Sequence, residues 1–353
     1  MYIVIAIIVF GILIGIHELG HFLAAKACRV RVNEFSIGMG PAILKKQKGE
    51  TLYALRVLPL GGYCAMEGED GDSSDERSFT RKSVWERLAV LFAGPFMNFL
   101  LGLLIVLLLY AQVEAFGSNV VDSFSEGVSM TGETVLEAGD RITRIDGKTV
   151  RYAGDFTLYM DRSGGKPVDM TVRRDGATLT LRQVLLEKKL FPNDDGTETY
   201  RYGVNFRTVR ATAGERLKLG LYQTYSFVRS VLMGLSDLIT GAVGLRDMSG
   251  AVGIVSVISE TGRSAPDART AVMNISYISA FLAVNLAVMN LLPIPALDGG
   301  RIFFMLVVHA LEKLLRRRID PRYEGYIHMA GMALLLALMA VLVVNDVWRI
   351  IGR

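Results

Sequence analysis

The 353-residue sequence contains few cysteines, and its longest hydrophobic segments contain almost no charge. Cys28 and Cys64 are too few to cross-link a domain, and we expect both to be reduced thiols. No cluster of lysine and arginine interleaved with aromatic residues is present, which argues against nucleic acid as a partner. Hydrophobic residues make up 51% of the chain and occur in blocks. The sequence therefore predicts a membrane protein rather than one large soluble core.

Four segments approach the roughly 20 apolar residues that a membrane-spanning helix needs. They are 2–25, 88–112, 271–297 and 327–344. The first segment lacks a basic start and a small-residue cleavage site, so we expect a retained span rather than a removed signal peptide. The last segment is short and needs little tilt to cross the bilayer.

Lysine and arginine are concentrated in two connections between the predicted spans. Residues 26–87 and the connection after Leu297, which includes Arg316, Arg317 and Arg318, are strongly basic close to span ends. Both connections should therefore be cytoplasmic, whereas the long middle connection can cross the membrane as a folded domain whatever its charge. This topology leaves both termini outside the cytoplasm. The predicted parts are two spans with a cytoplasmic loop (1–112), an extracytoplasmic domain (113–208), an interfacial segment (209–270) and two further spans (271–353).

The sequence His17-Glu18-Leu19-Gly20-His21 continues the first predicted span. On a helix, this pattern places two imidazoles on one face with a carboxylate beside them, as in two ligands and the general base of a catalytic zinc site. Ionisable groups inside a membrane are costly and indicate a functional site. His17 lies about 24 Å along the helix, near the cytoplasmic edge of a hydrocarbon core about 30 Å thick.

Asp298 can complete this site from the third span. Pro293 and Pro295 must break that helix just before Asp298. The first and third spans run in the same direction, so Asp298 reaches a depth similar to that of the histidines. A third ligand there leaves the fourth zinc position open for water. The alternative is an Asp-Gly-Gly turn at the membrane surface; the matching depth favours the ligand.

The motif, together with residues 290–300, resembles the site-2 protease family of intramembrane zinc metalloproteases. The resemblance is to its bacterial branch of regulator-of-sigma-E-protease type, which cleaves anti-sigma factors and carries a PDZ domain. It covers nearly the whole chain, and four more segments carry it: 35–40, 58–63, 93–98 and 249–254. By this resemblance, His17, His21 and Asp298 are zinc ligands and Glu18 is the catalytic acid and base.

The resemblance also implies substrate contacts and a location. Asn285 and Asn290 are expected to contact the substrate backbone near the zinc, and the stretch from Gly94 to Asn98 is expected to lie by the site. The expected substrates are single-span membrane proteins already trimmed outside, with remnant signal peptides as a second class. The expected location is the bacterial cytoplasmic (inner) membrane, with the active site near the cytoplasmic side.

The residue types in 51–66 alternate with the period of a β-strand, and the segment contains Gly61-Gly62. This pattern predicts a β-hairpin that turns at these glycines on the cytoplasmic face. In the family, a comparable loop offers an edge strand to the substrate, which would hold an unwound peptide by main-chain hydrogen bonds. A solvated hairpin that only covers the membrane face is the alternative.

Residues 115–206 predict a small α/β domain of short strands. Within it, residues 135–150 resemble a PDZ domain, in which Gly139-Asp140 opens a strand and Asp146-Gly147 forms the following turn. Such a domain either binds a peptide or substrate ectodomain or excludes substrates whose extracytoplasmic part is intact. Residues 215–241 predict an amphipathic helix at the outer interface, with a fifth span as the alternative.

The sequence therefore predicts a polytopic α-helical membrane protein with about four spans, a cytoplasmic membrane-associated β-hairpin and an inserted extracytoplasmic PDZ-like α/β domain. Its predicted function is an intramembrane zinc endopeptidase that acts on transmembrane proteins in the lipid bilayer. Two other classes remain. One is a non-proteolytic membrane scaffold with structural zinc, although such a site needs no base such as Glu18. The other is a zinc transporter, although only one compact ligand set is visible.

Overall fold

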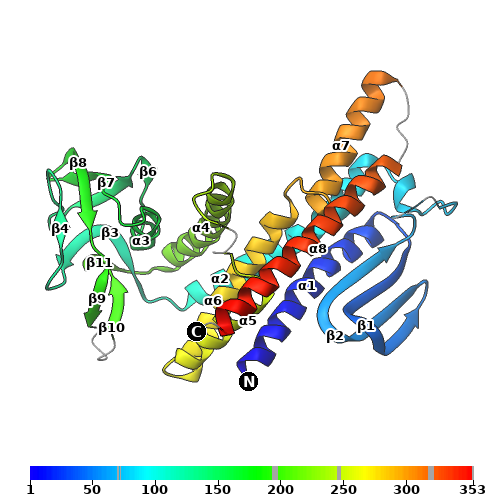
Figure 1. Cartoon of the computed structure of the whole chain (residues 1–353), viewed down its shortest axis with the longest axis horizontal. Helices are drawn as coiled ribbons and strands as arrows, with labels where there is room; N and C mark the ends of the chain where they lie inside the picture. The colour runs from blue at the N-terminus through cyan, green and yellow to red at the C-terminus, as the bar shows by residue number, and fades with distance from the viewer. Residues whose placement is uncertain (70, 72, 193–197, 245–247, 317–321, 352–353) are drawn as a thin grey trace. The chain divides into compact units, whose positions relative to one another are not determined.

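The computed structural model describes residues 1–69, 71, 73–192, 198–244, 248–316 and 322–351 (Figure 1). Arg317 and Arg318, which contribute to the predicted cytoplasmic charge, lie outside the described residues. The chain forms two compact units: Met1–Ala111 with Leu217–Arg353, and Gln112–Arg216. The first unit is mostly helical and carries one small sheet, whereas the second is built mainly of strands.

Long helices dominate the first unit. They are α1 (Tyr2–Ala27), α2 (Val84–Ala111), α4 (Ala213–Ile239), α5 (Ala251–Ser264), α6 (Ala268–Asn290), α7 (Asp298–Leu315) and α8 (Arg322–Ile351), with the 3-10 turn η1 (Phe79–Arg81) before α2. Four of the described helices, α1, α2, α6 and α8, are long and apolar enough to cross a membrane, which confirms the four predicted segments.

Two of these helices differ in length from the prediction. The helix α6 ends at Asn290 rather than Leu297, because Pro293 lacks an N–H group and disfavours helical backbone at the residue before it. The helix α8 is longer than the predicted 327–344. At its other end, α6 begins where the Asp267 carboxylate accepts a hydrogen bond from the Thr270 N–H at 2.8 Å.

The helices pack closely because small residues line their contacts. A Cβ at Gly20 of α1 would lie 2.3 Å from the carbonyl oxygen of Ala93 in α2, so only glycine permits this approach. Gly102 of α2 plays the same role against α6, where a Cβ would lie 2.7 Å from Val284 Cγ2. The motif helix α1 is thereby held directly against α2.

The segment predicted as one interfacial stretch, 209–270, contains two separate helices. Helix α4 buries one face, including Phe227, against Val106 of α2 and Ala280 of α6, and exposes the other, so it is amphipathic as predicted. Helix α5 instead packs inside the helical unit, where Ile258 is fully buried. Helix α4 is not among the four candidate spans, and its position at the membrane interface stays a prediction.

Strands β1 (Val32–Lys48) and β2 (Thr51–Met66) form the small sheet of the first unit, which Figure 1 shows beside α1. Residues 34–37 of β1 pair with 52–55 of β2 in the parallel direction and with 62–65 in the antiparallel direction, so the chain reverses between Leu55 and Gly62 as well as at Gly49-Glu50. The predicted reversal is confirmed and ends at Gly61-Gly62, where Gly61 has a positive φ of 89°. A Cβ at Gly62 would lie 2.9 Å from the carbonyl oxygen of Ser36. The glycine pair therefore ends the reversal, and Gly62 also permits close packing against β1.

The second unit is a β-rich fold with one described helix, α3 (Ala153–Arg162). Its main sheet has the order β11-β3-β5-β7-β8-β4, with β6 paired to β5, and β9 and β10 form a separate hairpin. The strands are β3 (Ala115–Phe124), β4 (Met130–Thr131), β5 (Arg141–Ile145), β6 (Lys148–Thr149), β7 (Val168–Arg174), β8 (Ala177–Leu186), β9 (Lys189–Pro192), β10 (Glu198–Arg201) and β11 (Val204–Arg210).

Two local predictions for this unit are confirmed. Strand β5 begins directly after Asp140, and Asp146-Gly147 form the turn from β5 to β6 with positive φ angles of 45° and 75°. The Asp140 side chain is fully buried and accepts two hydrogen bonds from the Arg174 guanidinium, at 2.7 and 2.8 Å. The identity of the unit as a PDZ domain stays a prediction.

Candidate metal centre

Three side chains predicted as zinc ligands converge in the helical unit. His17 and His21 lie one turn apart on α1, and their Nε2 atoms are 3.2 Å from each other. Asp298, the first residue of α7, places its Oδ2 3.2 Å from His17 Nε2 and 3.5 Å from His21 Nε2. One ligand atom from each residue lies within 4.8 Å of the other two. The structure thus brings together residues some 280 positions apart in the chain.

The turn between α6 and α7 determines where Asp298 lies. Ala296 has a left-handed backbone with φ of 74°, and Leu297 returns to extended backbone before α7 begins. Gly299 packs directly on the start of this turn, since a Cβ there would lie 2.3 Å from the Leu291 carbonyl oxygen. Asp298 therefore stands both in an Asp-Gly-Gly turn and beside the two histidines, so the two interpretations of the sequence are compatible.

Helix α2 orients the second histidine. The Nδ1 of His21 lies 2.8 Å from the Val90 carbonyl oxygen, which can accept only if Nδ1 carries the proton. That tautomer leaves the Nε2 lone pair directed at the centre. Gly94 makes room for both rings, since a Cβ there would lie 2.3 Å from His21 Nε2 and 2.9 Å from His17 Cε1.

Glu18 lies beside the three candidate ligands. Its carboxylate interacts electrostatically with His17, His21 and Asp298 and hydrogen-bonds to the backbone of Cys64 in β2. A Cβ at Gly62 would lie 3.4 Å from Glu18 Cγ, so β2 runs directly past this carboxylate. The sheet and the candidate acid and base are thus adjacent.

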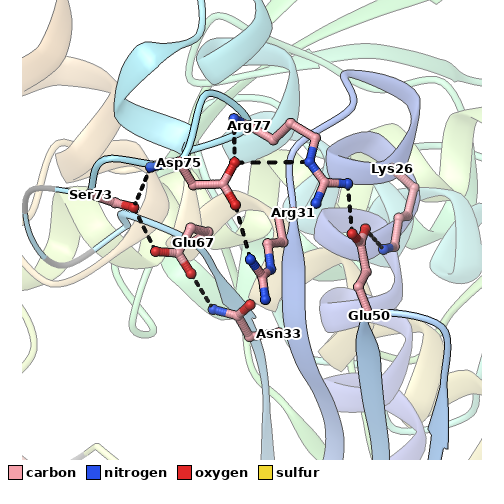
Figure 2. Close-up of polar contacts among 8 residues, drawn as sticks. All are labelled: Lys26, Arg31, Asn33, Glu50, Glu67, Ser73, Asp75 and Arg77. Carbon is pink, nitrogen blue, oxygen red and sulfur yellow. Dashed lines mark hydrogen bonds and ion pairs between the residues drawn. The ribbon is translucent and has the colours of Figure 1, made fainter.

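A polar network holds the sheet to the end of α1, as Figure 2 shows. Glu50, in the turn between β1 and β2, accepts hydrogen bonds from Lys26 Nζ at 2.8 Å and from Arg77 at 2.6 Å. The Lys26 ammonium, and after it Arg77, lower the pKa of the Glu50 carboxyl below its usual value despite some desolvation. The turn of the sheet is thereby bonded to the last turn of the motif helix.

The same network fixes the segment after β2. The pKa of Asp75 is lowered, first by the hydrogen bond from the Arg77 backbone N–H and then by Arg31, whose guanidinium lies 3.0 Å away. The pKa of Glu67 is lowered mainly by the Asn33 side-chain amide, which donates at 2.8 Å (Figure 2). These contacts join the start of β1 to the connection that leads to α2.

The donor set fits zinc. Two imidazole nitrogens and one carboxylate oxygen are the ligands of catalytic sites that keep a fourth position for water or substrate. The carbonyl partner of His21 is the kind of group that supports a metal-bound imidazole. Nδ1 of His17 is buried and has no hydrogen-bond partner among the described residues. We therefore regard this cluster as the candidate metal centre.

The three predicted substrate-binding asparagines lie on the helices around the centre. Asn98 is 1% exposed on α2, one turn beyond Gly94. Asn285 and Asn290 are half-buried in the last turns of α6. None of the three hydrogen-bonds to a candidate ligand in the described part of the chain, and their substrate contacts stay predictions.

Sequence reasoning missed the residues that support the ligands. The Val90 carbonyl carries no sequence signal, because any residue has one. The same holds for His328, whose Nδ1 lies 3.1 Å from the Ala296 backbone nitrogen, two residues before Asp298. Only a contact across helices reveals such a role.

Four candidate spans and a compact group of two histidines and an aspartate together define a class, a multi-pass membrane protein with a metallohydrolase-type centre. Peptidase family M50 matches residues 5–338. A candidate zinc metalloprotease of Clostridium perfringens is 36% identical over 350 residues, which is 98% of each chain. The regulator of sigma-W protease RasP of Bacillus subtilis is 27% identical, over 98% of this chain and 97% of its own.

The chain belongs to peptidase family M50, the site-2 protease family. It is a zinc metalloprotease of the site-2 type rather than the non-proteolytic scaffold that the sequence alone left open. The RasP zinc metalloprotease of Geobacillus kaustophilus, 28% identical over 97% of each chain, is a further relative.

Proposed function

We propose that this chain is an intramembrane endopeptidase that cleaves single-span membrane proteins, with His17, His21 and Asp298 holding zinc and Glu18 as acid and base. The main support is the convergence of these three ligand atoms within 4.8 Å beside Glu18 on a candidate membrane span. Zinc held there lowers the pKa of water and polarises a peptide carbonyl.

The residues of the chain have separate tasks in this reaction. Glu18 takes the proton of the attacking water and delivers it to the nitrogen of the leaving amine. The Val90 carbonyl keeps His21 in the tautomer that can bind a metal. His21 is buried and His17 is half-buried, so access of bulk water is restricted, which strengthens the charge interactions in the site.

The substrate must be unwound before it can react, because its scissile carbonyl is hydrogen-bonded within a helix. Strand β2 passes Glu18, so a peptide paired with this sheet by strand addition would lie next to the acid and base. Asn98, Asn285 and Asn290 are the side chains that we assign to the substrate backbone as its helix opens.

We further propose a bacterial cytoplasmic (inner) membrane location with both termini outside and the centre near the cytoplasmic face. The two strongly basic connections support this topology. The proposed substrates are proteins of the anti-sigma-factor type and remnant signal peptides. The unit Gln112–Arg216, if PDZ-like, then lies outside and either binds substrate ectodomains or excludes untrimmed ones.

The decisive experiment replaces Glu18 by glutamine. We expect Glu18→Gln to retain zinc and to lose cleavage of a single-span reporter, because glutamine preserves shape but cannot carry the proton. Asp298→Ala is expected to lose zinc and activity together. Glu76→Gln, at an exposed glutamate, is the control and should cleave normally. Normal cleavage by Glu18→Gln contradicts the mechanism, and full zinc binding by Asp298→Ala contradicts the ligand assignment.

A further inference from the structure

Helix α8 contacts the rest of the helical unit at few points. Most of its described residues are exposed, and of those whose burial is described only Gly331 and Asp346 are buried. Asp346 contacts the start of α5, where its carboxylate accepts hydrogen bonds from the Gly250 and Gly253 N–H groups at 3.2 and 2.8 Å. The other contact, around Gly331, is with the turn that precedes Asp298.

Three observations define this second contact. The Ala296 N–H donates a hydrogen bond to His328 Nδ1 at 3.1 Å. One helical turn further along α8, a Cβ at Gly331 would lie 2.3 Å from Pro295 Cβ, so the helix backbone packs directly on the turn. The ring of Phe304, from α7, meets the His328 ring edge-on with centroids 5.5 Å apart. His328 is thus held between the turn and the first part of α7.

The turn itself offers little to hold Ala296. Within it, the Ile294 N–H bonds to the Leu292 carbonyl at 2.7 Å, and the Leu297 N–H bonds to the Ile294 carbonyl at 3.2 Å. Pro293 and Pro295 have no N–H to donate. Ala296 adopts a left-handed backbone, which is uncommon for a residue with a side chain. The hydrogen bond that Ala296 donates to His328 comes from outside the turn.

We propose that His328 is a positioning residue that holds the turn before Asp298 in the conformation that presents its carboxylate to the two histidines. The proposal rests on the proposed ligand role of Asp298. His328 acts through the Ala296 backbone and not on the substrate. Its accepting Nδ1 requires that the proton of the neutral ring lie on Nε2.

The test compares two substitutions of His328. His328→Asn keeps an acceptor, because Oδ1 of asparagine, like Nδ1 of histidine, is bonded to Cγ. His328→Leu removes the acceptor and leaves an apolar side chain. We expect His328→Leu to weaken zinc affinity and lower kcat by about 10–100-fold, the usual effect of losing a group that supports a metal ligand. KM should change little, and His328→Asn should restore most of both quantities.

A second variant tests the same contact without changing the histidine. Gly331→Ala places a methyl group against Pro295 and should lift α8 from the turn, with losses like those of His328→Leu. Gly325→Ala is its matched control, since a Cβ at Gly325 meets nothing within 4 Å. His309→Leu, at an exposed histidine of α7, is the control for the loss of an imidazole and should behave like the wild type.

Zinc affinity is measured by chelator competition on the full-length protein in detergent, and kcat and KM with a single-span reporter. The proposal is overturned if His328→Leu matches the wild type, or if His328→Asn is as impaired as His328→Leu. Asp298→Ala, measured in the same assays, separates the ligand role of Asp298 from the positioning role of His328. If Asp298→Ala keeps zinc and activity, the ligand assignment fails; if it loses both while His328→Leu is normal, only the role of His328 fails.

Discussion

At the scale of single residues, the candidate centre depends on a glycine as much as on its ligands. Gly94 carries only a hydrogen where a Cβ would lie 2.3 Å from His21 Nε2. Alanine at this position therefore has to displace a candidate ligand or separate α1 from α2. Either movement disturbs a geometry that must hold to within about 0.5 Å.

We expect Gly94→Ala to reduce zinc affinity about 10–100-fold. Gly15→Ala, on α1, is the matched control, because a Cβ there would make only an ordinary contact of 3.9 Å with Ile37. Chelator competition measures the zinc affinity of both variants. Equal zinc affinity in both would show that the space at Gly94 does not shape the centre.

At the scale of elements, acid should loosen the attachment of the sheet to α1. The pKa values of Glu50, Glu67 and Asp75 are lower in the folded protein than in the unfolded chain. The folded state therefore binds fewer protons, and the stabilisation is complete above the unfolded carboxyl pKa of about 4. It is lost as the pH falls through the lower, folded values.

Glu50→Gln isolates this contribution. At pH 7 the variant should unfold at a lower temperature than the wild type, and the difference should shrink as the pH falls from 7 to 3. Thermal unfolding followed by circular dichroism measures both midpoints at each pH. Glu76→Gln, at an exposed residue of the same connection, should show no such trend. A difference that stays constant with pH would rule out the ionic attachment.

Two further elements, α5 and α8, are joined by a carboxylate. Asp346 is 2% exposed and accepts the N–H groups of Gly250 and Gly253, which belong to the otherwise unsatisfied start of α5. Asp346→Ala should therefore lower the free energy of unfolding by about 1–3 kcal/mol, and Asp346→Asn by less, because one acceptor remains. Equilibrium unfolding in detergent measures both, with Glu260→Gln on the exposed side of α5 as control.

At the scale of the whole molecule, zinc should stabilise one unit and not the other. All three candidate ligands belong to the helical unit, and none lies in Gln112–Arg216. Removing zinc with a chelator should abolish cleavage and lower the stability of the helical unit, by about 2.7 kcal/mol if the free metal had been at 100 times its Kd. Added zinc should restore both.

Amide hydrogen exchange of the full-length protein locates this effect. Protection in α1 and α7 should fall on chelation, while protection in strands β5, β7 and β8 should not change. A uniform loss of protection across both units would contradict the assignment of the centre to the helical unit alone.

The sequence predicted most of the elements because their signals are local. Four apolar segments, the proline break before Asp298 and the Asp146-Gly147 turn each depend on neighbouring residues, although the helix ends earlier than predicted, at Asn290. The glycine pair Gly61-Gly62, where the reversal within β2 ends, is a local signal of the same kind. The pair did not reveal that the segments on either side of the reversal both pair with residues 34–37 of β1, because that pairing depends on contacts between distant parts of the sequence.

By itself, the sequence indicated a metal site, because two imidazoles and a carboxylate in a membrane-spanning helix are too costly without a metal. It also pointed to Asp298 through a comparison of depths. Only the tertiary structure decided how these groups are held. The Val90 carbonyl, the hydrogen of Gly94 and the Nδ1 of His328 act across helices, and the positions of such contacts depend on packing rather than on any local pattern.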